Sequence, residues 1–120
     1  REYWSEYHRL GARSGVTPDI AKLDMRRRAS LIGAMMVRLG AADGMLCGLL
    51  GRYSSNLRFI DLVLGKRPGV QNFSAMNMVM LPGRTVFICD TYVNFDPTPE
   101  QIVESTLLAA EEISRFGLVP

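Results

Sequence analysis

The feature that most constrains the fold is a nearly continuous apolar stretch, NFSAMNMVMLPGRTVFICDTYVN, at residues 72–94. Pro82 and Gly83 divide this stretch, and a Pro-Gly pair is a turn signal, so the pattern predicts two strands joined by a tight turn. Apolar residues occur on both faces of each strand over most of its length, unlike the alternation of a half-exposed sheet. Strands that are hidden on both faces need helices above and below them. The stretch therefore predicts an α/β fold.

Two helix starts carry strong local signals. The sequence TPD at 17–19 offers a capping threonine, a proline at the first helical position and an acidic residue near the positive helix end. It predicts a helix that ends near Arg28, and a second helix should cover residues 30–39. The sequence TPEQ at 98–101 is a capping box, and its helix should end at Gly117. One face of that last helix is expected to point inward: Ile102, Thr106, Ala110, Ile113 and Phe116.

A shorter apolar run, DGMLCGLL at 43–50, is bounded by charge and glycine. It favours a buried strand, although its periodicity alone also allows a helix. The first residues carry a helical spacing without a capping residue, and the chain stops at LVP, residues 118–120, where an alternating α/β fold would begin its next strand. We therefore expect a fragment of a larger domain, with no complete second domain.

Composition excludes several classes of partner. The 120 residues suffice for one domain or part of one, and the 14 basic and 12 acidic residues are interleaved, so no extended positive surface for nucleic acid is expected. No apolar run reaches the roughly 18 residues of a membrane span, and no signal-peptide core is present. Cys47 and Cys89 lie far apart inside apolar runs, without metal-ligand spacing. They predict two reduced, buried thiols and a cytoplasmic location.

The stretch GLLGRYSSNLRFIDLVLG at 48–65 is a candidate anion site. Its glycines would let backbone approach a ligand, helix amides would point at it, and Arg52 and Arg58 would add positive charge. Ser54 or Ser55 is expected to cap the helix, whose inward residues are expected to be Leu57, Ile60 and Leu64. An ordinary strand-to-helix turn with surface arginines explains the same residues, because neither a P-loop nor a G-x-G-x-x-G fingerprint is present.

Two further groups of residues allow two interpretations each. Asp90 and Asn94 follow an apolar strand, where open α/β sheets place ligands, but both residue types also organise turns. Met76, Met78 and Met80 line one face of a strand, which fits core packing or a contact with another subunit. The single histidine, His8, excludes a histidine cluster for metal and lacks a nearby nucleophile, so it is expected to be an ordinary exposed or half-buried side chain.

The segments ADGMLCG, LRFIDLVLGKRPGV, DTYVNFDPTPEQ and AAEEISRFGLVP carry a family resemblance. With them the chain resembles the phosphotransacetylase family, and most closely the phosphotransacetylase-like C-terminal domain of hybrid NADP-dependent malic enzymes. The resemblance implies that residues 1–120 are an internal part of a phosphate acetyl/butyryl transferase-like domain. It also implies a three-layer α/β/α sandwich, like that of isocitrate and isopropylmalate dehydrogenases, of which only a fragment is present.

The chain departs from stand-alone members of that family in one place. They carry a pattern close to S-G-A-x-H-S-T-A-D-T-x-R-P, where this chain has Cys47 for the first serine and Gly51-Arg52-Tyr53 for the His-Ser-Thr run, and keeps Arg58. The family's N-D-L-S-R-G run, which serves acetyl transfer, is expected beyond the last residue. Asp90 and Asp96 have no visible partner that would replace its general base. The comparison implies a pocket that holds an anion without catalysing acetyl transfer.

The resemblance implies a regulatory function. Such domains are understood to sense acetyl-CoA and to build the oligomer, while N-terminal domains of the same chain convert malate to pyruvate with NADP and a divalent metal, Mg or Mn. No cofactor is expected in this segment. Two alternatives stay open: a purely structural oligomerisation module, and an active phosphate acetyltransferase that makes acetyl-CoA from acetyl phosphate and CoA. The residues expected to bind acetyl-CoA, a related acyl-CoA or an acyl phosphate are Arg52, Tyr53, Ser54, Ser55, Arg58, Asp90 and Asn94.

Overall fold

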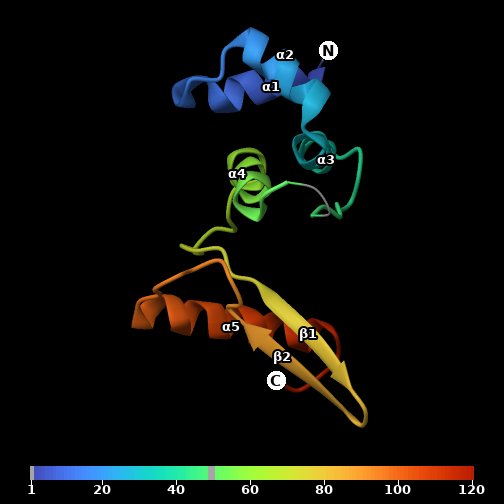
Figure 1. Cartoon of the computed structure of the whole chain (residues 1–120), viewed down its shortest axis with the longest axis vertical. Coiled ribbons are helices and arrows are strands. Elements are labelled where there is room, and N and C mark those ends of the chain that lie inside the picture. Colours follow the sequence, from blue (N-terminus) through green and yellow to red (C-terminus); the bar gives the residue numbers. More distant parts are fainter. Residues whose placement is uncertain (1, 49–50) are drawn as a thin grey trace. The chain divides into compact units, whose positions relative to one another are not determined.

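The computed structural model describes residues 2–48 and 51–120, and it divides into two compact units (Figure 1). The helical unit lies within residues 1–65 and the hairpin unit comprises residues 66–120. Each unit is described by itself. The helical unit contains α1 (Glu2–Gly11), the short 3₁₀ helix η1 (Ala12–Ser14), α2 (Pro18–Arg27), α3 (Ala29–Arg38) and α4 (Tyr53–Val63). The hairpin unit contains β1 (Met76–Leu81), β2 (Arg84–Cys89) and α5 (Pro99–Arg115).

The helical unit has one apolar core. Helix α1 packs against α2, and α3 packs against α4. The largest side chains that are completely buried belong to Leu31, Met35 and Val63. Apolar side chains from all four helices therefore meet in a single cluster, whose buried members are Tyr7, Val16, Ala21, Leu31, Ala34, Met35 and Val63.

Both strong helix starts are confirmed. The Thr17 hydroxyl accepts a hydrogen bond from the Ile20 amide at 3.3 Å. At α5, the Thr98 amide donates to the Gln101 side-chain oxygen at 2.9 Å, and the Gln101 amide donates back to the Thr98 hydroxyl at 3.4 Å. These contacts satisfy amides that a helix leaves without an internal partner. Among the described residues, no helix is long and apolar enough to cross a membrane.

The hairpin unit is an antiparallel pair of strands with one helix. The pairing runs from Met76 opposite Cys89 to Leu81 opposite Arg84, so Pro82 and Gly83 form a two-residue turn, as expected. Gly83 has a φ of 77°, a conformation that side-chain-bearing residues rarely adopt. Helix α5 packs against β2. The prediction of an α/β fold is confirmed, while the three-layer sandwich stays a prediction.

The expectation that both faces of the strands are buried is wrong for this structure. Only Met76 and Phe87 are even half-buried, and the other strand residues are exposed. One helix covers at most one face of a sheet, and α5 is the helix that contacts the hairpin within its unit. Met78 and Met80 are 47% and 76% exposed, which does not fit core packing.

The strand expected over residues 43–50 does not form within residues 43–48, and residues 49–50 lie outside the described part of the chain. A strand needs a neighbour to satisfy its backbone, and the sheet of the described residues contains β1 and β2 alone. The expected burial of the two thiols is also wrong, because Cys47 and Cys89 are both exposed. His8 is half-buried, as expected.

The inward faces of two helices differ from expectation. In α4, Val63 is buried, with Phe59 and Leu62 packed against the core, whereas Leu57 and Ile60 are only half-buried. Leu64 is exposed. In α5, Ile113 is buried as expected, but the other buried residues are Ser105 and Ala109. The expected inward residues Ile102 and Phe116 are exposed. In both helices the apolar stripe is wider than the surface that packs against it.

Candidate functional site

The helix of the predicted anion site, α4, begins at Tyr53, so the expectation that Ser54 or Ser55 caps it is wrong. The N-cap residue is Arg52, which has an extended backbone and makes no side-chain hydrogen bond to the helix amides. Both serines therefore lie inside the first turn. The side chain of the N-cap residue therefore does not cap the positive end of the α4 helix dipole.

The side chains at this end form a positively charged, exposed group. Ser54 and Ser55 precede Arg58 by four and three positions, which places all of them on one side of α4. Arg52, Tyr53, Ser54, Ser55 and Arg58 are all exposed. Neither Arg52 nor Arg58 forms an ion pair within the part of the chain that the structure describes. Two cations and two hydroxyls at a helix start can hold an anion.

The positive charge of Arg58 affects the pKa of Tyr7, a buried residue of the helical unit. Burial and the nearby Asp24 carboxylate raise the pKa of Tyr7 to about 12, and the charge of Arg58 opposes this shift. The Tyr7 hydroxyl donates a hydrogen bond to Asp24 at 3.2 Å. The side chain of Arg58 therefore starts close to the edge of the core, on a helix whose position the core determines.

Asp90 and Asn94 belong to the hairpin unit, so they are described apart from the group at α4. The Asp90 carboxylate accepts hydrogen bonds from the amides of Ala75 at 2.9 Å, Val93 at 3.3 Å and Asn94 at 2.8 Å. It also accepts one from the Asn94 side chain at 2.6 Å. Burial alone would raise the pKa of Asp90, but these hydrogen bonds outweigh it and hold the pKa below its ordinary value.

Asn94 is engaged in the same turn. Its side-chain nitrogen also donates to the carbonyl oxygen of Phe73 at 2.9 Å. Together Asp90 and Asn94 join the segment after β2 to the segment before β1, which agrees with the interpretation that they organise a turn. Their role in ligand binding stays a prediction.

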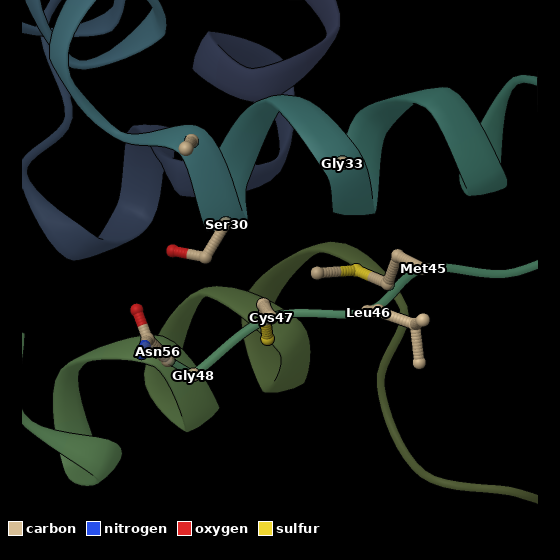
Figure 2. Close-up of a pocket in the computed structure, with 8 residues that line it drawn as sticks. Ser30, Gly33, Met45, Leu46, Cys47, Gly48 and Asn56 are labelled. Atoms are coloured by element: carbon tan, nitrogen blue, oxygen red, sulfur yellow. The ribbon is translucent and has the colours of Figure 1, made fainter. Parts of the chain in front are cut away.

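A pocket of about 620 Å³ lies elsewhere in the helical unit, and none of the predicted ligand-binding residues lines it. Figure 2 shows it between the start of α3, residues 45–48 and α4, with Ser30 and Asn56 directed toward one another from the two helices. Sequence reasoning missed Ser30 and Asn56 as residues of a shared pocket. One local signal existed, since Gly33 inside a helix costs stability and calls for a packing reason. The lining residues are Ala29, Ser30, Gly33, Met45, Leu46, Cys47, Gly48 and Asn56.

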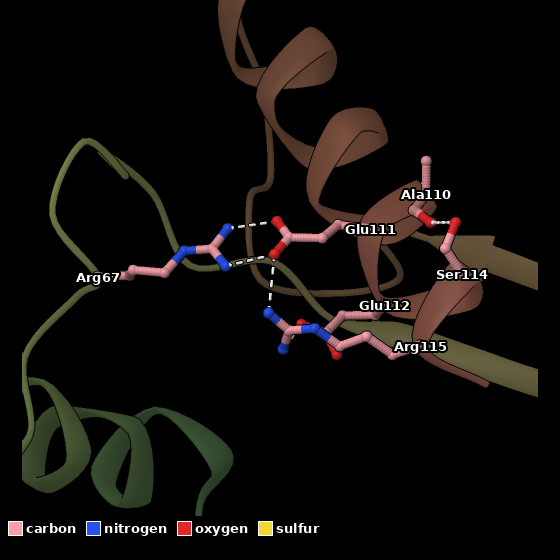
Figure 3. A network of polar contacts seen from close by, with 6 residues as sticks. All are labelled: Arg67, Ala110, Glu111, Glu112, Ser114 and Arg115. Atoms are coloured by element: carbon pink, nitrogen blue, oxygen red, sulfur yellow. Dashed lines mark hydrogen bonds and ion pairs between the residues drawn. The ribbon is translucent and has the colours of Figure 1, made fainter. Parts of the chain in front are cut away.

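The hairpin unit carries a network of ion pairs (Figure 3). Arg67 donates to both carboxylate oxygens of Glu111, at 2.8 and 2.6 Å. Arg115 donates to Glu111 and Glu112, each at 2.7 Å. The network joins the segment before β1 to α5, and both of its arginines, Arg67 and Arg115, are paired with carboxylates. Within the described residues, no group of three or more His, Cys, Asp or Glu side chains is placed to hold a metal ion.

Comparison with known proteins assigns the whole chain to the family that the sequence resembles. The sequence model of a family described as phosphate acetyl/butaryl transferase matches residues 1–120. The NADP-dependent malic enzyme of Salmonella typhimurium is 46% identical over 120 residues, which cover 100% of this chain and 16% of that protein. The NAD-dependent malic enzyme of Rhizobium meliloti is 42% identical over 120 residues, with the same two coverages of 100% and 16%.

The chain is also similar to phosphate acetyltransferases. The phosphate acetyltransferase of Synechocystis sp. is 34% identical over 121 residues, which cover 100% of this chain and 17% of that protein. The chain thus spans about a sixth of the length of these curated relatives.

Proposed function

Because the chain belongs to the phosphate acetyl/butaryl transferase family, we propose that it is an internal part of such a domain in an NADP-dependent malic enzyme. In this proposal the domain completes a three-layer α/β/α sandwich and regulates the parent enzyme. The parent converts malate to pyruvate in the cytoplasm with NADP and Mg or Mn, which bind in its malic-enzyme domains. The regulatory ligand is acetyl-CoA, a related acyl-CoA or an acyl phosphate.

The observation that carries this proposal is the exposed, unpaired positive charge at the start of α4. Arg52 and Arg58 flank a helix end that its N-cap side chain does not cap, beside the hydroxyls of Ser54 and Ser55. Phosphate groups are recognised by this combination of helix amides, guanidinium groups and hydroxyls. The phosphates of the ligand therefore bind at this end of α4.

A sensing role explains the chemistry better than catalysis. Acetyl transfer to CoA needs a base that removes the thiol proton. The Asp90 carboxylate is already engaged by four hydrogen bonds, and its low pKa makes it a poor proton acceptor. A regulatory ligand needs only to bind two conformations of the enzyme with different affinity.

The test is malate-dependent NADPH formation by the full-length parent, with and without acetyl-CoA. We expect acetyl-CoA to change the rate in the wild type, and Arg58→Ala to raise the half-effective acetyl-CoA concentration about tenfold at an unchanged basal rate. Arg26→Ala is the matched control, because Arg26 is an exposed arginine of α2 that forms no ion pair among the described residues. The proposal fails if acetyl-CoA leaves the wild-type rate unchanged.

One observation favours a second candidate function, a structural oligomerisation module. Met78 and Met80 are exposed on β1, and a soft apolar surface suits a contact with another subunit. Under this alternative, Met78→Asp dissociates the full-length oligomer in sedimentation experiments, and acetyl-CoA neither binds nor alters malate oxidation. Formation of acetyl-CoA from acetyl phosphate and CoA by the complete domain would instead support an active acetyltransferase.

A further inference from the structure

Helix α2 has an exposed side that combines apolar and basic residues. Ile20, Leu23 and Arg27 are spaced by three and four positions, so they line one side of the helix, turned away from the buried Ala21. Ile20 is 43% exposed, Leu23 is 47% exposed, and Arg27 is exposed as well. Arg27 forms no ion pair within the described residues. This side of α2 therefore ends in a cation that has no carboxylate.

Helix α5 carries the opposite combination. Glu100, Val103 and Leu107 are spaced by three and four positions, on the side of α5 opposite the buried Ala109. Val103 and Leu107 are 57% and 66% exposed, and Glu100 is exposed and forms no ion pair in the part of the chain that the structure describes. Hydrogen bonding with its own amide and with Thr98 lowers the pKa of Glu100, so this side of α5 begins with a charged carboxylate.

A groove of about 370 Å³ lies along the same side of α5. Its apolar lining includes Val103 and Leu107, and its charged lining residues are three carboxylates and one guanidinium. The guanidinium belongs to Arg67 and is already bound to Glu111 (Figure 3). The groove is therefore negative overall, and it suits a helix that offers apolar side chains together with positive charge.

The two exposed sides match when the helices run antiparallel. In each helix the outer two of the three residues are seven positions apart, which is about 10 Å along the helix axis. An antiparallel arrangement brings apolar residues against apolar residues and Arg27 against Glu100, whereas a parallel one would bring Arg27 against Leu107. The antiparallel pairs are Ile20 with Leu107, Leu23 with Val103, and Arg27 with Glu100.

We propose that α2 of one copy of this chain packs antiparallel against α5 of a second copy. The charges of the two units support this choice of partner. Residues 1–65 contain 10 basic and 6 acidic residues, and residues 66–120 contain 4 basic and 6 acidic residues. The helical unit of one copy therefore attracts the hairpin unit of another. When two copies exchange these helices, the contact forms twice.

This contact goes beyond the proposed function. It uses neither the arginines and serines at the start of α4 nor the exposed methionines of β1. A failure of acetyl-CoA regulation therefore does not bear on it, and its own failure leaves the regulatory proposal unchanged.

The test exchanges the charges of the Arg27 and Glu100 pair in the full-length protein. Arg27→Glu and Glu100→Lys each turn attraction into repulsion at both contacts of a dimer, so each should raise the dissociation constant in sedimentation experiments about tenfold. When the two variants are co-expressed, a mixed dimer has opposite charges at both contacts and should recover most of the affinity. Arg13→Glu and Asp96→Lys are the matched controls, because both residues are exposed, lie outside α2 and α5, and form no ion pair among the described residues.

A second measurement tests the register of the two helices. In a background with Cys47→Ser and Cys89→Ser, full-length subunits with Leu23→Cys are co-expressed with subunits with Val103→Cys and oxidised with diamide. We expect a covalent dimer on a non-reducing gel, because the antiparallel register brings these positions within reach of a disulfide. Ser114→Cys in place of Val103→Cys should give no covalent dimer, because Ser114 lies about 16 Å further along α5.

Three results would overturn the inference. Association of both single variants with the affinity of the wild type would show that the charge pair makes no contact. Recovery in a chain that carries both substitutions, without recovery in the mixed dimer, would place the contact within one chain. Equal cross-linking of Leu23→Cys to Val103→Cys and to Ser114→Cys would show that the helices have no fixed register.

Discussion

In the helical unit, apolar side chains from four helices meet in one core, whereas in the hairpin unit polar side chains link the chain around a much smaller apolar centre. Glu104 shows the second principle: its carboxylate accepts hydrogen bonds from the amides of Gln71 and Asn72 at 2.7 and 2.9 Å, which joins the segment before β1 to α5. Asp90 acts in the same way after β2. Hydrogen bonds to carboxylates thus hold the segments of the hairpin unit together, whereas apolar burial holds the helices of the helical unit together.

The comparison also explains where apolar surface remains. In the hairpin unit, Met80, Val103 and Leu107 are more than half exposed. The helical unit covers its large core residues, but it also exposes apolar side chains, of which Leu46 and Leu23 are examples, beside the charged and hydroxyl side chains of α4. Under the proposed function, the helical unit is the framework that would position the proposed ligand site, and the exposed apolar side chains of the hairpin unit would suit contact with further protein.

The largest effect is expected from the helical core. Leu31 is completely buried, so Leu31→Ala should lower the free energy of unfolding by about 2–5 kcal/mol, because the substitution removes contacts and leaves a cavity. Met80→Ala, at 76% exposure, should change it by less than about 0.5 kcal/mol. Denaturant unfolding of both variants measures the difference. A large loss for Met80→Ala would show that the strand surface is covered in solution.

The next effect concerns the polar centre of the hairpin unit. Asp90→Ala leaves the amides of Ala75, Val93 and Asn94 without their acceptor and should cost about 1–3 kcal/mol. Asp90→Asn retains one oxygen acceptor and should cost less. Hydrogen exchange at the Ala75 and Asn94 amides reports the change directly. If exchange stays slow in Asp90→Ala, the turn does not depend on the carboxylate.

A smaller effect appears at high pH in the helical unit. Tyr7 has its pKa raised from the ordinary 10.0 to about 12, first because of burial and then because of Asp24. The unfolded chain ionises first, so stability from the neutral phenol is present below pH 10 and is lost as the pH rises from 10 to 12. Tyr7→Phe should remove this alkaline loss and cost about 1 kcal/mol at neutral pH. Absorbance titration of the phenol and unfolding at several pH values check both statements.

The smallest effect is expected from an ion pair at the edge of the same unit. Hydrogen bonds from Arg9, with a further one from Arg38, lower the pKa of Glu6 from the ordinary 4.5 to about 2. A lowered pKa stabilises the fold above pH 4.5, and this contribution is lost as the pH falls from 4.5 to 2. Glu6→Gln should cost about 1 kcal/mol or less at neutral pH and nothing near pH 2. A penalty that is constant across this pH range would contradict the assignment to the ion pair.

Much of the secondary structure could be predicted from the sequence. The helix starts at Thr17 and Thr98 and the turn at Pro82 and Gly83 are all confirmed. Each depends on hydrogen bonds or dihedral angles among residues close together in the chain, so the residues that specify it are adjacent in the sequence. Arg52 and Arg58 lie on one short helical segment, so the sequence could single them out, while their role in ligand binding stays a prediction.

The candidate pocket could not be found by the same reasoning. Ser30 and Asn56 lie on different helices, and Met45 reaches Gly33 only because α3 and the segment after it fold back on one another. No spacing rule connects such residues. The strand expected at 43–48 failed for a related reason, because a strand exists only where a neighbour pairs with it.

The sequence by itself determined where α2 and α5 begin, where the hairpin turns, and which segment near a helix start carries positive charge. The tertiary structure decided which helix faces are buried, that both thiols are exposed, and that Asp90 serves a turn. The division has a physical cause. Caps and turns are stabilised by interactions between residues a few positions apart. Buried faces, pockets and carboxylates that accept several hydrogen bonds depend on residues that only the folded chain brings together.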